Sequence, residues 1–285
     1  MGTQIAAKLN WLQHNLPDGL VVDAAWLEGQ GFSSALRSKY VRHGWLEQVA
    51  RAVYRRPPAR LSTPGEEEGL RWQNVVVSLQ TLLACPVAVG GRSAIEQQGF
   101  AHYLASSGLR EVHLYGEETL PGWVSKLRLD TRFVFHNANR FFKKGSVLRG
   151  RLPTTASDTA SAQGGFIRQP WGHRDWPIVM SAPERAILEL LDEVPQRETF
   201  HQADMLMEGL RNLSPRRLQK LLADCRSIKV KRLFLWFAER HNHAWLKKLD
   251  RSGINLGRGK RMLVRGGKLD PKYNITVPGD LDAHG

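Results

Sequence analysis

Hydrophobic positions in the first sixty residues recur at helical spacing and then alternate. One face of the first helix carries Ile5, Leu9, Leu12 and Leu16. Asp23 and Ser33 are placed to cap a second and a third helix, and Gly44 ends the third because glycine readily adopts positive φ. Residues 45–56 then alternate in two short runs, as a β-hairpin does. Three helices followed by a hairpin predict a winged helix-turn-helix domain over residues 1–60.

Two segments with the composition of linkers or loops divide the rest of the chain. Residues 57–65 hold three prolines, and the glutamates after them suit the first turn of a helix, where the helix dipole favours carboxylates. Residues 153–169 are rich in Thr, Ser, Ala and Gly, and we expect a long mobile loop there. The first region is the predicted boundary of a second, larger domain at residues 66–285.

The first part of the larger domain mixes helices and strands. We expect helices up to residue 83 and from Ser93 onward. The expected strands are residues 87–89, 112–115 and 132–136. Residues 66–180 are therefore predicted to be a mixed α/β part, and the whole chain to be α+β.

The last hundred residues show mainly helical patterns. Ser181 and Glu184 have the spacing of a capping box, in which each side chain satisfies a backbone donor of the other residue. Ser214 precedes a proline and is placed to cap a further helix, which another helical run follows. Residues 256–277 alternate as strands. We expect residues 181–285 to form a basic part made of helices plus terminal strands.

The charge of the chain indicates a polyanionic partner. Its 285 residues hold 41 Lys and Arg against 27 Asp and Glu, a net charge of +14, and the isoelectric point is about 10.2. The excess lies at the two ends, with 8 basic and 4 acidic residues in 1–60 and 19 and 12 in 186–285. Nucleic acid is the usual partner of such a protein, and an acidic membrane surface is the weaker alternative.

The third predicted helix carries side chains suited to DNA. On a helical wheel Leu36, Tyr40 and His43 share a face, which we expect to pack inward. On the opposite face arginines can pair with guanine, serines can donate or accept, and a flanking lysine suits phosphate, while hairpin arginines suit the backbone or minor groove. The predicted DNA-binding residues are Ser33, Ser34, Arg37, Ser38, Lys39, Arg42, Arg51, Arg55 and Arg56. The alternative is a three-helix packing module with a solvated basic face.

A second group of cations is spread over the C-terminal part. Its members are Lys229, Lys231, Arg232, Arg258, Lys260, Arg261, Arg265 and Lys268. Such residues can add contacts to nucleic acid, dock a partner, or form a solvated face without a binding role.

The residue types needed for metal binding and nucleophilic catalysis do not gather in a recognisable motif. Cys85 and Cys225 lie far apart in apolar settings, which excludes a disulfide framework or zinc quartet and favours a reducing compartment. Two metal-like spacings lack a further ligand: His241 with His243, and His201 with Asp204. We therefore expect no metal, no cofactor and no enzymatic activity. A DNA-processing enzyme remains the alternative, with carboxylates around Glu96 to hold Mg²⁺.

Motifs for phosphate binding and for membrane insertion are also lacking. The glycine turn at residues 90–91 matches no phosphate-loop motif. The most apolar stretch, residues 75–89, is shorter than the ~20 residues that a bilayer needs, and the N-terminus lacks a leader pattern. We expect a cytoplasmic protein without membrane contact.

Five short motifs stand in the order found in one protein family: residues 44–46, 52–57, 91–94, 113–116 and 181–189. Through them the chain resembles, over nearly its whole length, the AbiEi antitoxins of bacterial type IV toxin–antitoxin systems. One departure is Ala52, which stands where we expect glycine in the turn of the wing. Either that turn is strained or it is of another type.

The resemblance implies a transcriptional autorepressor that binds repeats in its own promoter, as double-stranded DNA, through the N-terminal domain. It also implies an antitoxin that counters a cognate nucleotidyltransferase toxin without a stable protein complex, in a system that can abort phage infection. The C-terminal region would carry this activity, and its basic residues are candidates for the antitoxic surface or for additional DNA contact. A plain winged-helix regulator with a ligand-sensing domain is the alternative.

Overall fold

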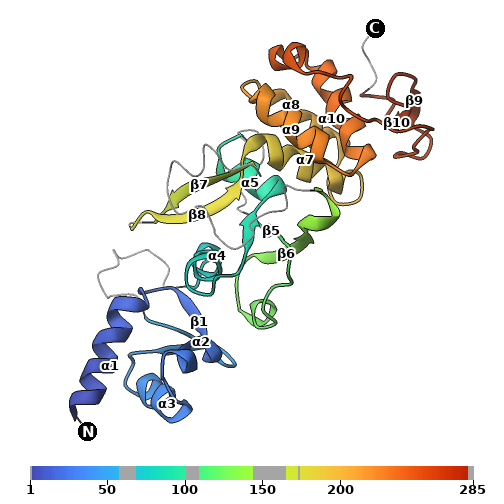
Figure 1. Ribbon diagram of the computed structural model, residues 1–285. Coiled ribbons are helices and arrows are strands. Elements are labelled where there is room, and N and C mark those ends of the chain that lie inside the picture. Colours follow the sequence, from blue (N-terminus) through green and yellow to red (C-terminus); the bar gives the residue numbers. More distant parts are fainter. Residues whose placement is uncertain (1, 58–68, 101–108, 144–164, 173, 282–285) are drawn as a thin grey trace. The chain divides into compact units, whose positions relative to one another are not determined.

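The computed structural model describes residues 2–57, 69–100, 109–143, 165–172 and 174–281 of the chain. Helices and mixed sheets alternate along it, as expected for the α+β class (Figure 1). The chain folds into two compact units. The first unit consists of Met1–Cys85, Leu120–Phe133 and Pro170–Ile178, and the second unit consists of Pro86–Thr119, Val134–Gln169 and Val179–Gly285.

The first unit begins with three helices and a three-stranded sheet. In chain order its elements are α1 (Gly2–Asn15), β1 (Val21–Asp23), α2 (Ala24–Gly29), α3 (Ser34–Arg42), β2 (Glu47–Ala50) and β3 (Val53–Arg55). The sheet is antiparallel in the order β1-β3-β2. The predicted helices and hairpin are confirmed. Strand β1 was not predicted, because only its pairing with β3 distinguishes its short apolar run from a turn.

Local capping explains where these helices begin and end. The Asp23 carboxylate accepts a hydrogen bond of 2.8 Å from the backbone N–H of Trp26 at the start of α2. The Ser33 hydroxyl accepts one of 3.3 Å from Leu36 at the start of α3, and Gly44 follows that helix at φ +72°. Both predicted caps are therefore confirmed.

Later segments complete the first unit. Helix α4 (Trp72–Thr81) is shorter than predicted, and residues 58–68 before it lie outside the described part. Its Ser78 hydroxyl accepts a hydrogen bond of 2.8 Å from the backbone N–H of Val21 in β1. A second hydrogen bond comes from Trp123, which directly precedes the short helix η1 (Val124–Lys126). Its indole N–H donates to the Asp23 carboxylate across 3.2 Å. The first unit thus continues beyond the proline-rich segment.

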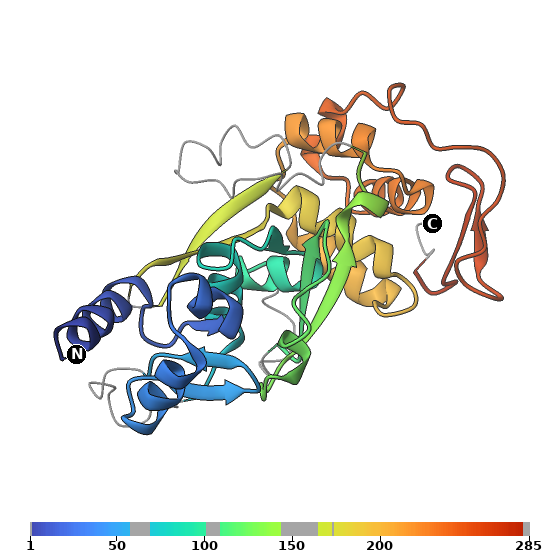
Figure 2. The same cartoon turned by 60° about the horizontal axis from the view of Figure 1, so that its bottom comes forward.

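Most residues of a five-stranded mixed sheet belong to the second unit (Figure 2). Its order is β6-β5-β4-β8-β7, with β4 antiparallel to β5 and parallel to β8. The strands are β4 (Val87–Val89), β5 (Glu111–Gly116), β6 (Arg132–Asn137), β7 (Phe166–Trp171) and β8 (Trp176–Ser181). Helix α5 (Gly91–Gln97) packs against α7 (Pro183–Glu193). Strands β4, β5 and β6 confirm the predicted positions.

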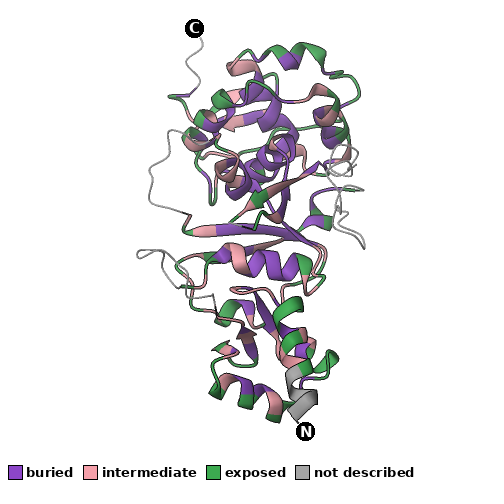
Figure 3. Ribbon diagram, turned by 90° about the vertical axis from the view of Figure 1, so that its left-hand side faces the viewer, coloured by how far each residue is buried: buried purple, intermediate pink, exposed green. Residues whose placement is uncertain are grey.

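The C-terminal half of the second unit is helical. It comprises α8 (Phe200–Gly209), α9 (Pro215–Asp224), α10 (Ile228–Arg240), η3 (Ala244–Lys248) and the paired strands β9 (Lys268–Asp270) and β10 (Ile275–Val277). Helix α10 packs against α7, α8 and β10, and its Leu233, Phe234 and Phe237 are fully buried. Figure 3 shows buried residues concentrated along such helices. The predicted start of α9 at Ser214 is confirmed, and α10 is the helical run that was expected after it.

Two expectations for this unit are wrong. Ser181 and Glu184 form no capping box: the N-cap of α7 is Ala182, and the Glu184 carboxylate instead accepts hydrogen bonds of 2.7 Å from Ser214 and from Arg217. The expected loop at 153–169 ends in strand β7, while residues 153–164 lie outside the described part. Glu184 is engaged by partners about thirty residues later in the chain, whereas β7 pairs with the strand that directly follows it, β8.

Candidate nucleic-acid interface

Helix α3 presents a polar, basic face. Ser34, Ser38, Lys39 and Arg42 are exposed on it, together with the small side chain of Ala35. The aromatic ring of Tyr40 is fully buried on the opposite side, against Phe32 and Trp45. The expectation that Tyr40 packs inward is therefore confirmed, and the four polar residues lie where DNA could reach them.

Arg37 does not belong to this face, and its expected outward position is wrong. Only 5% of the residue is exposed. Its guanidinium donates hydrogen bonds of 2.7 Å to the carbonyl of Phe32 and 2.8 Å to the carboxylate of Glu28, and it lies 5.9 Å from the ring centre of Tyr54. Burial of a charged head group requires hydrogen bonds and an opposite charge to offset its desolvation, and Phe32 and Glu28 supply them here. The buried face of α3 is thus rotated toward Arg37, which leaves His43 exposed and Leu36 half-buried.

The three arginines of the hairpin also differ in how far they are exposed. Arg51 is exposed in the turn between β2 and β3. Arg55 is buried and pairs with Glu47 across 2.6 Å, so its expected contact with DNA is contradicted. Arg56 is half-buried, pairs with Asp18 across 3.1 Å and also donates to the carbonyl of Gln13. Arg55 therefore links β3 to β2 within the sheet, whereas Arg56 links the chain after β3 to Gln13 and Asp18. Arg51 is the hairpin arginine best placed for a polyanion.

The predicted C-terminal cations fall into two groups. Lys231 and Arg232 on α10 are buried, and Arg232 donates to the carbonyls of Leu256 (2.8 Å) and Gly259 (2.7 Å). Lys229 is half-buried, and its ammonium donates to two carbonyls near the end of α7. These three residues are therefore structural. The exposed ones, which we call the C-terminal basic segment, are Arg258, Lys260, Arg261, Arg265 and Lys268.

Motif residues of the second unit form a buried ionic network that the sequence did not suggest. Arg185 and Glu189 of α7 pair across 2.7 Å with neither side chain exposed. The Arg185 guanidinium lies between two rings, 4.3 Å from the centre of Phe142 and 4.2 Å from that of Phe166. Burial raises the pKa of the Glu189 carboxyl, and the Arg185 cation opposes this shift. The signal available in the sequence was the spacing of Arg185 and Glu189, which are four residues apart on one helix and can therefore pair.

The glycine turn before α5 fits against this network. The backbone N–H of Gly91 donates to the Glu189 carboxylate across 3.0 Å. A Cβ atom on Gly90 would lie 2.4 Å from the same carboxylate, so no other residue fits there without displacement. The next residue, Arg92, pairs with Glu198 through its Nε at 2.6 Å. The turn therefore bonds to side chains of the protein itself, as expected for a plain strand-to-helix turn.

Two histidines of neighbouring strands lie edge to edge with nearly parallel rings. His113 of β5 and His136 of β6 have ring centres 5.1 Å apart, and Nδ1 of the first lies 2.9 Å from Nε2 of the second. Nδ1 of His136 lies 3.4 Å from the Glu193 carboxylate. If that Nδ1 carries the proton, the facing Nε2 accepts from His113. Burial lowers the pKa of both rings, that of His136 to about 4, so both are neutral at pH 7.

The residues with metal-like spacing form hydrogen bonds and ion pairs within the protein. His241 contacts Asp204 across 2.7 Å, His201 contacts Asp280, and His243 bonds to the carbonyl of Met207. Among the described residues no group of three His, Cys, Asp or Glu is placed to hold a metal ion. Within the same part of the chain, no helix has the length and apolar character needed to cross a bilayer.

Two family models match the chain. "Transcriptional regulator, AbiEi antitoxin N-terminal domain" matches residues 5–106, and "Transcriptional regulator, AbiEi antitoxin, Type IV TA system" matches residues 110–278. No curated protein sequence matches it. The crystal structure of the RV2827C protein from Mycobacterium tuberculosis is similar in fold, with a TM-score of 0.53 and 14% identity over 96% of this chain and 90% of that chain.

These matches define a class of transcriptional regulators. Because the two models together span nearly the whole sequence, the chain belongs to the AbiEi antitoxin family of type IV toxin–antitoxin systems. The five sequence motifs that suggested this family therefore led to the right one. In the second unit these motifs include the residues of the buried ionic network.

Proposed function

We propose that the first unit binds the promoter of its own operon as a winged helix-turn-helix repressor. The observation that carries this proposal is the exposed polar and basic face of α3 in a unit whose helices and antiparallel sheet follow the winged-helix order. A recognition helix in the major groove needs such a face. The family description, a transcriptional regulator, supports the same role.

Each exposed side chain has a distinct task in this proposal. Arg42 pairs with the acceptor edge of guanine, and Ser34 and Ser38 donate to or accept from base edges. Lys39 and Arg51 contact phosphates, which adds affinity without sequence preference. Ser33 lies beside the phosphate backbone while its hydroxyl caps α3. Arg37, Arg55 and Arg56 support the fold in place of the DNA contacts that the sequence suggested.

We further propose that the second unit counteracts a cognate nucleotidyltransferase toxin in the cytoplasm, without a stable complex and without catalysis of its own. The family description as a type IV antitoxin supports this role. The C-terminal basic segment is the proposed antitoxic surface, because its five cations are exposed while the neighbouring Lys231 and Arg232 are engaged in internal hydrogen bonds. Abortive infection of phage-infected cells is the expected outcome of the pair.

Fluorescence anisotropy tests the repressor half. The full-length protein is titrated onto DNA from its own upstream region and onto scrambled DNA, at two salt concentrations. Arg42→Ala should cost about 1–3 kcal/mol on the operator and relax sequence preference, whereas Lys39→Ala should lower the salt slope by about 0.9. Arg216→Ala, an exposed arginine of α9, is the matched control. Equal affinity of the wild-type protein for both DNAs would contradict the proposal.

Growth rescue tests the antitoxin half. A truncated second unit is unsuitable, because the first unit includes the later segments Leu120–Phe133 and Pro170–Ile178. We therefore use full-length Arg42→Ala, which should still rescue cells that express the adjacent toxin from a separate promoter. Glu substitutions at Arg258, Lys260 and Arg261 should abolish rescue while operator binding persists. Rescue that is lost with Arg42→Ala and kept in the triple variant would assign protection to repression.

A further inference from the structure

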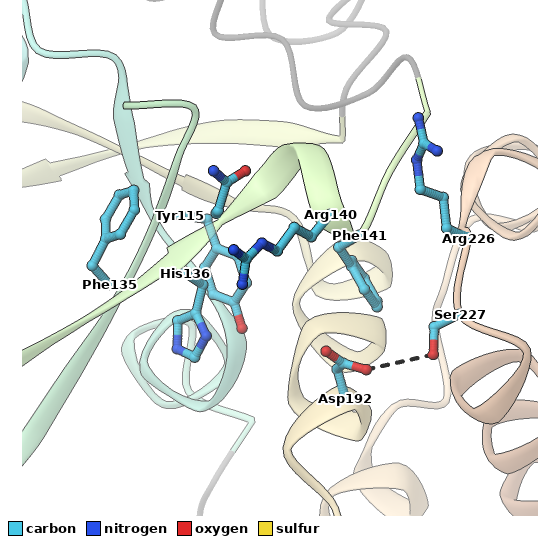
Figure 4. Close-up of a pocket in the computed structure, with 9 residues that line it drawn as sticks. Tyr115, Phe135, His136, Arg140, Phe141, Asp192, Arg226 and Ser227 are labelled. Atoms are coloured by element: carbon cyan, nitrogen blue, oxygen red, sulfur yellow. Dashed lines mark hydrogen bonds between the residues drawn. The ribbon is translucent and has the colours of Figure 1, made fainter. Parts of the chain in front are cut away.

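We propose that the second unit binds a nucleotide, free or at the end of a strand, in a pocket that we call the two-arginine pocket. The pocket has a volume of about 430 Å³ and lies where β5, β6 and η2 (Ala138–Arg140) meet α7 and the start of α10. All of its lining residues belong to the second unit. Figure 4 shows the residues that line it, with Arg140 extending toward Tyr115 and His136 and with Phe135 and Arg226 at opposite sides. This volume lies within the usual range for small-molecule sites.

One wall of the pocket is an aromatic stack that is already formed. The rings of Tyr115 and His136 are nearly parallel, with centres 4.5 Å apart and an angle of 13° between their planes. His113 lies edge to edge with His136, its Nδ1 2.9 Å from the Nε2 of His136, and does not line the pocket. Tyr115 is buried and His136 is half-buried, so the ring that is open to a planar base is that of His136, and stacking on an aromatic ring suits any base.

Two arginines supply positive charge at the same pocket. Arg140 is exposed at the end of η2, and its guanidinium has no hydrogen-bond or ion-pair partner among the residues that the structure describes. In Figure 4 its side chain extends across the pocket toward Tyr115 and His136. Arg226 donates from Nε to the carbonyl of Phe142 across 3.3 Å, which leaves its terminal amino groups for an anion. Each guanidinium can bind a phosphate oxygen through charge-assisted hydrogen bonds.

The remaining polar groups favour a nucleotide over a bare anion. Asp192 and Ser227 line the pocket and contact each other across 3.4 Å, and Asn137 adds an amide. These groups can hydrogen-bond to a base edge or to a sugar hydroxyl. His136 is neutral at pH 7, so it offers stacking area in place of charge. Phosphate recognition then depends on the two arginines.

Isothermal titration of the full-length protein with AMP, adenosine and inorganic phosphate tests the proposal. AMP should bind at least about tenfold more tightly than adenosine or phosphate alone, because the ring and the phosphate engage different groups of the pocket. Arg140→Ala and Arg226→Ala should each weaken AMP binding about tenfold or more, the usual effect of losing a charged hydrogen bond. Arg216→Ala, on the exposed face of α9 outside the pocket, should change nothing.

Three outcomes would overturn the proposal: no heat of binding at millimolar AMP, equal affinity for AMP and inorganic phosphate, or unchanged AMP affinity in both pocket variants. Arg140 is exposed, so its variant should fold, and circular dichroism checks this directly. A 5′-phosphorylated dinucleotide distinguishes the two sources of the ligand. Tighter binding than AMP indicates a strand end, and weaker binding indicates a free nucleotide. Operator binding is measured in parallel, so failure at this pocket is distinguishable from failure of the repressor role.

Discussion

Arg185 and Glu189, one turn apart on α7, form an ion pair of 2.7 Å in which neither side chain is exposed. Isolating either charge in the core would be costly, since the desolvation of an ion is repaid only by its partner and by further hydrogen bonds. The Gly91 N–H provides one such bond to the carboxylate, and the rings of Phe142 and Phe166 flank the guanidinium. The pair therefore connects the helix, the glycine turn and the aromatic core of the second unit.

Breaking this pair from one side should be strongly destabilising. We expect Arg185→Met to lower the free energy of unfolding by about 3–5 kcal/mol, because Glu189 would stay buried without its cation. The double variant Arg185→Met with Glu189→Leu should recover much of that loss, since no unpaired charge remains. Urea unfolding of the wild type, both single variants and the double variant measures the coupling. Strictly additive losses would show that the two charges do not depend on each other.

The turn between β2 and β3 contains a strained residue. Ala52 has φ +61°, in the left-handed region that disfavours side chains. The departure from glycine noted in the sequence is thus accommodated by strain and not by another kind of backbone turn. Ala52→Gly should raise the stability of the first unit by roughly 0.5–1 kcal/mol.

The opposite change is expected at Ala35, which is an exposed residue of α3. There Ala35→Gly should cost roughly 0.5–1 kcal/mol, because glycine loses more backbone entropy in a helix. Thermal unfolding of both variants gives the comparison. If both substitutions shift the midpoint in the same direction, the strain at Ala52 is not the cause.

The sequence was informative wherever structure depends on neighbouring residues. The caps at Asp23, Ser33 and Ser214 involve a hydroxyl or carboxylate and a backbone N–H three residues later, so their spacing suffices. Prediction from the sequence failed where a residue far away in the chain determines the contacts of a side chain. Glu184 has the spacing of a capping residue but bonds to Ser214 and Arg217, about thirty residues away.

The same reason explains the errors at the candidate site. A helical wheel places charged residues outward, yet Arg37 is buried because the Phe32 carbonyl and the Glu28 carboxylate on the preceding segment accept from its two terminal amino groups. Neither partner can be inferred from periodicity within α3. Exposed positions such as Ser38 and Arg42 were found because, within the described part of the chain, nothing nearby draws them inward.

Arg37 and Arg42 should therefore respond differently to the same substitution. Arg37→Ala removes a buried head group with its hydrogen bonds and leaves Glu28 without its cation, so it should lower the melting temperature of the first unit. The folded fraction of this variant should keep the operator preference of the wild type. Arg42→Ala should have the reverse effect, with unchanged stability and relaxed preference. Thermal unfolding and anisotropy on the same samples separate the two roles. Unchanged melting of Arg37→Ala would contradict its structural assignment.

His136 should make the stability of the second unit depend on pH. Burial, assisted by His113 and Arg197, lowers its pKa in the folded protein from 6.5 to about 4. Between those two values the unfolded chain binds a proton that the folded chain does not, so stability falls as the pH falls through this window. The loss should reach roughly 3 kcal/mol at the acidic end, at about 1.4 kcal/mol per pH unit.

The measurement compares slopes, because other groups titrate nearby. The pKa of His113 is also lowered by burial, whereas those of the Glu189 and Glu193 carboxyls are raised by it, which adds a dependence of opposite sign. Urea unfolding from pH 7.5 to 4.5 should therefore show a flatter profile for His136→Asn than for the wild type. His43→Asn, at an exposed position of the first unit, serves as the control. Parallel profiles for the wild type and His136→Asn would mean that folding does not lower the pKa of His136.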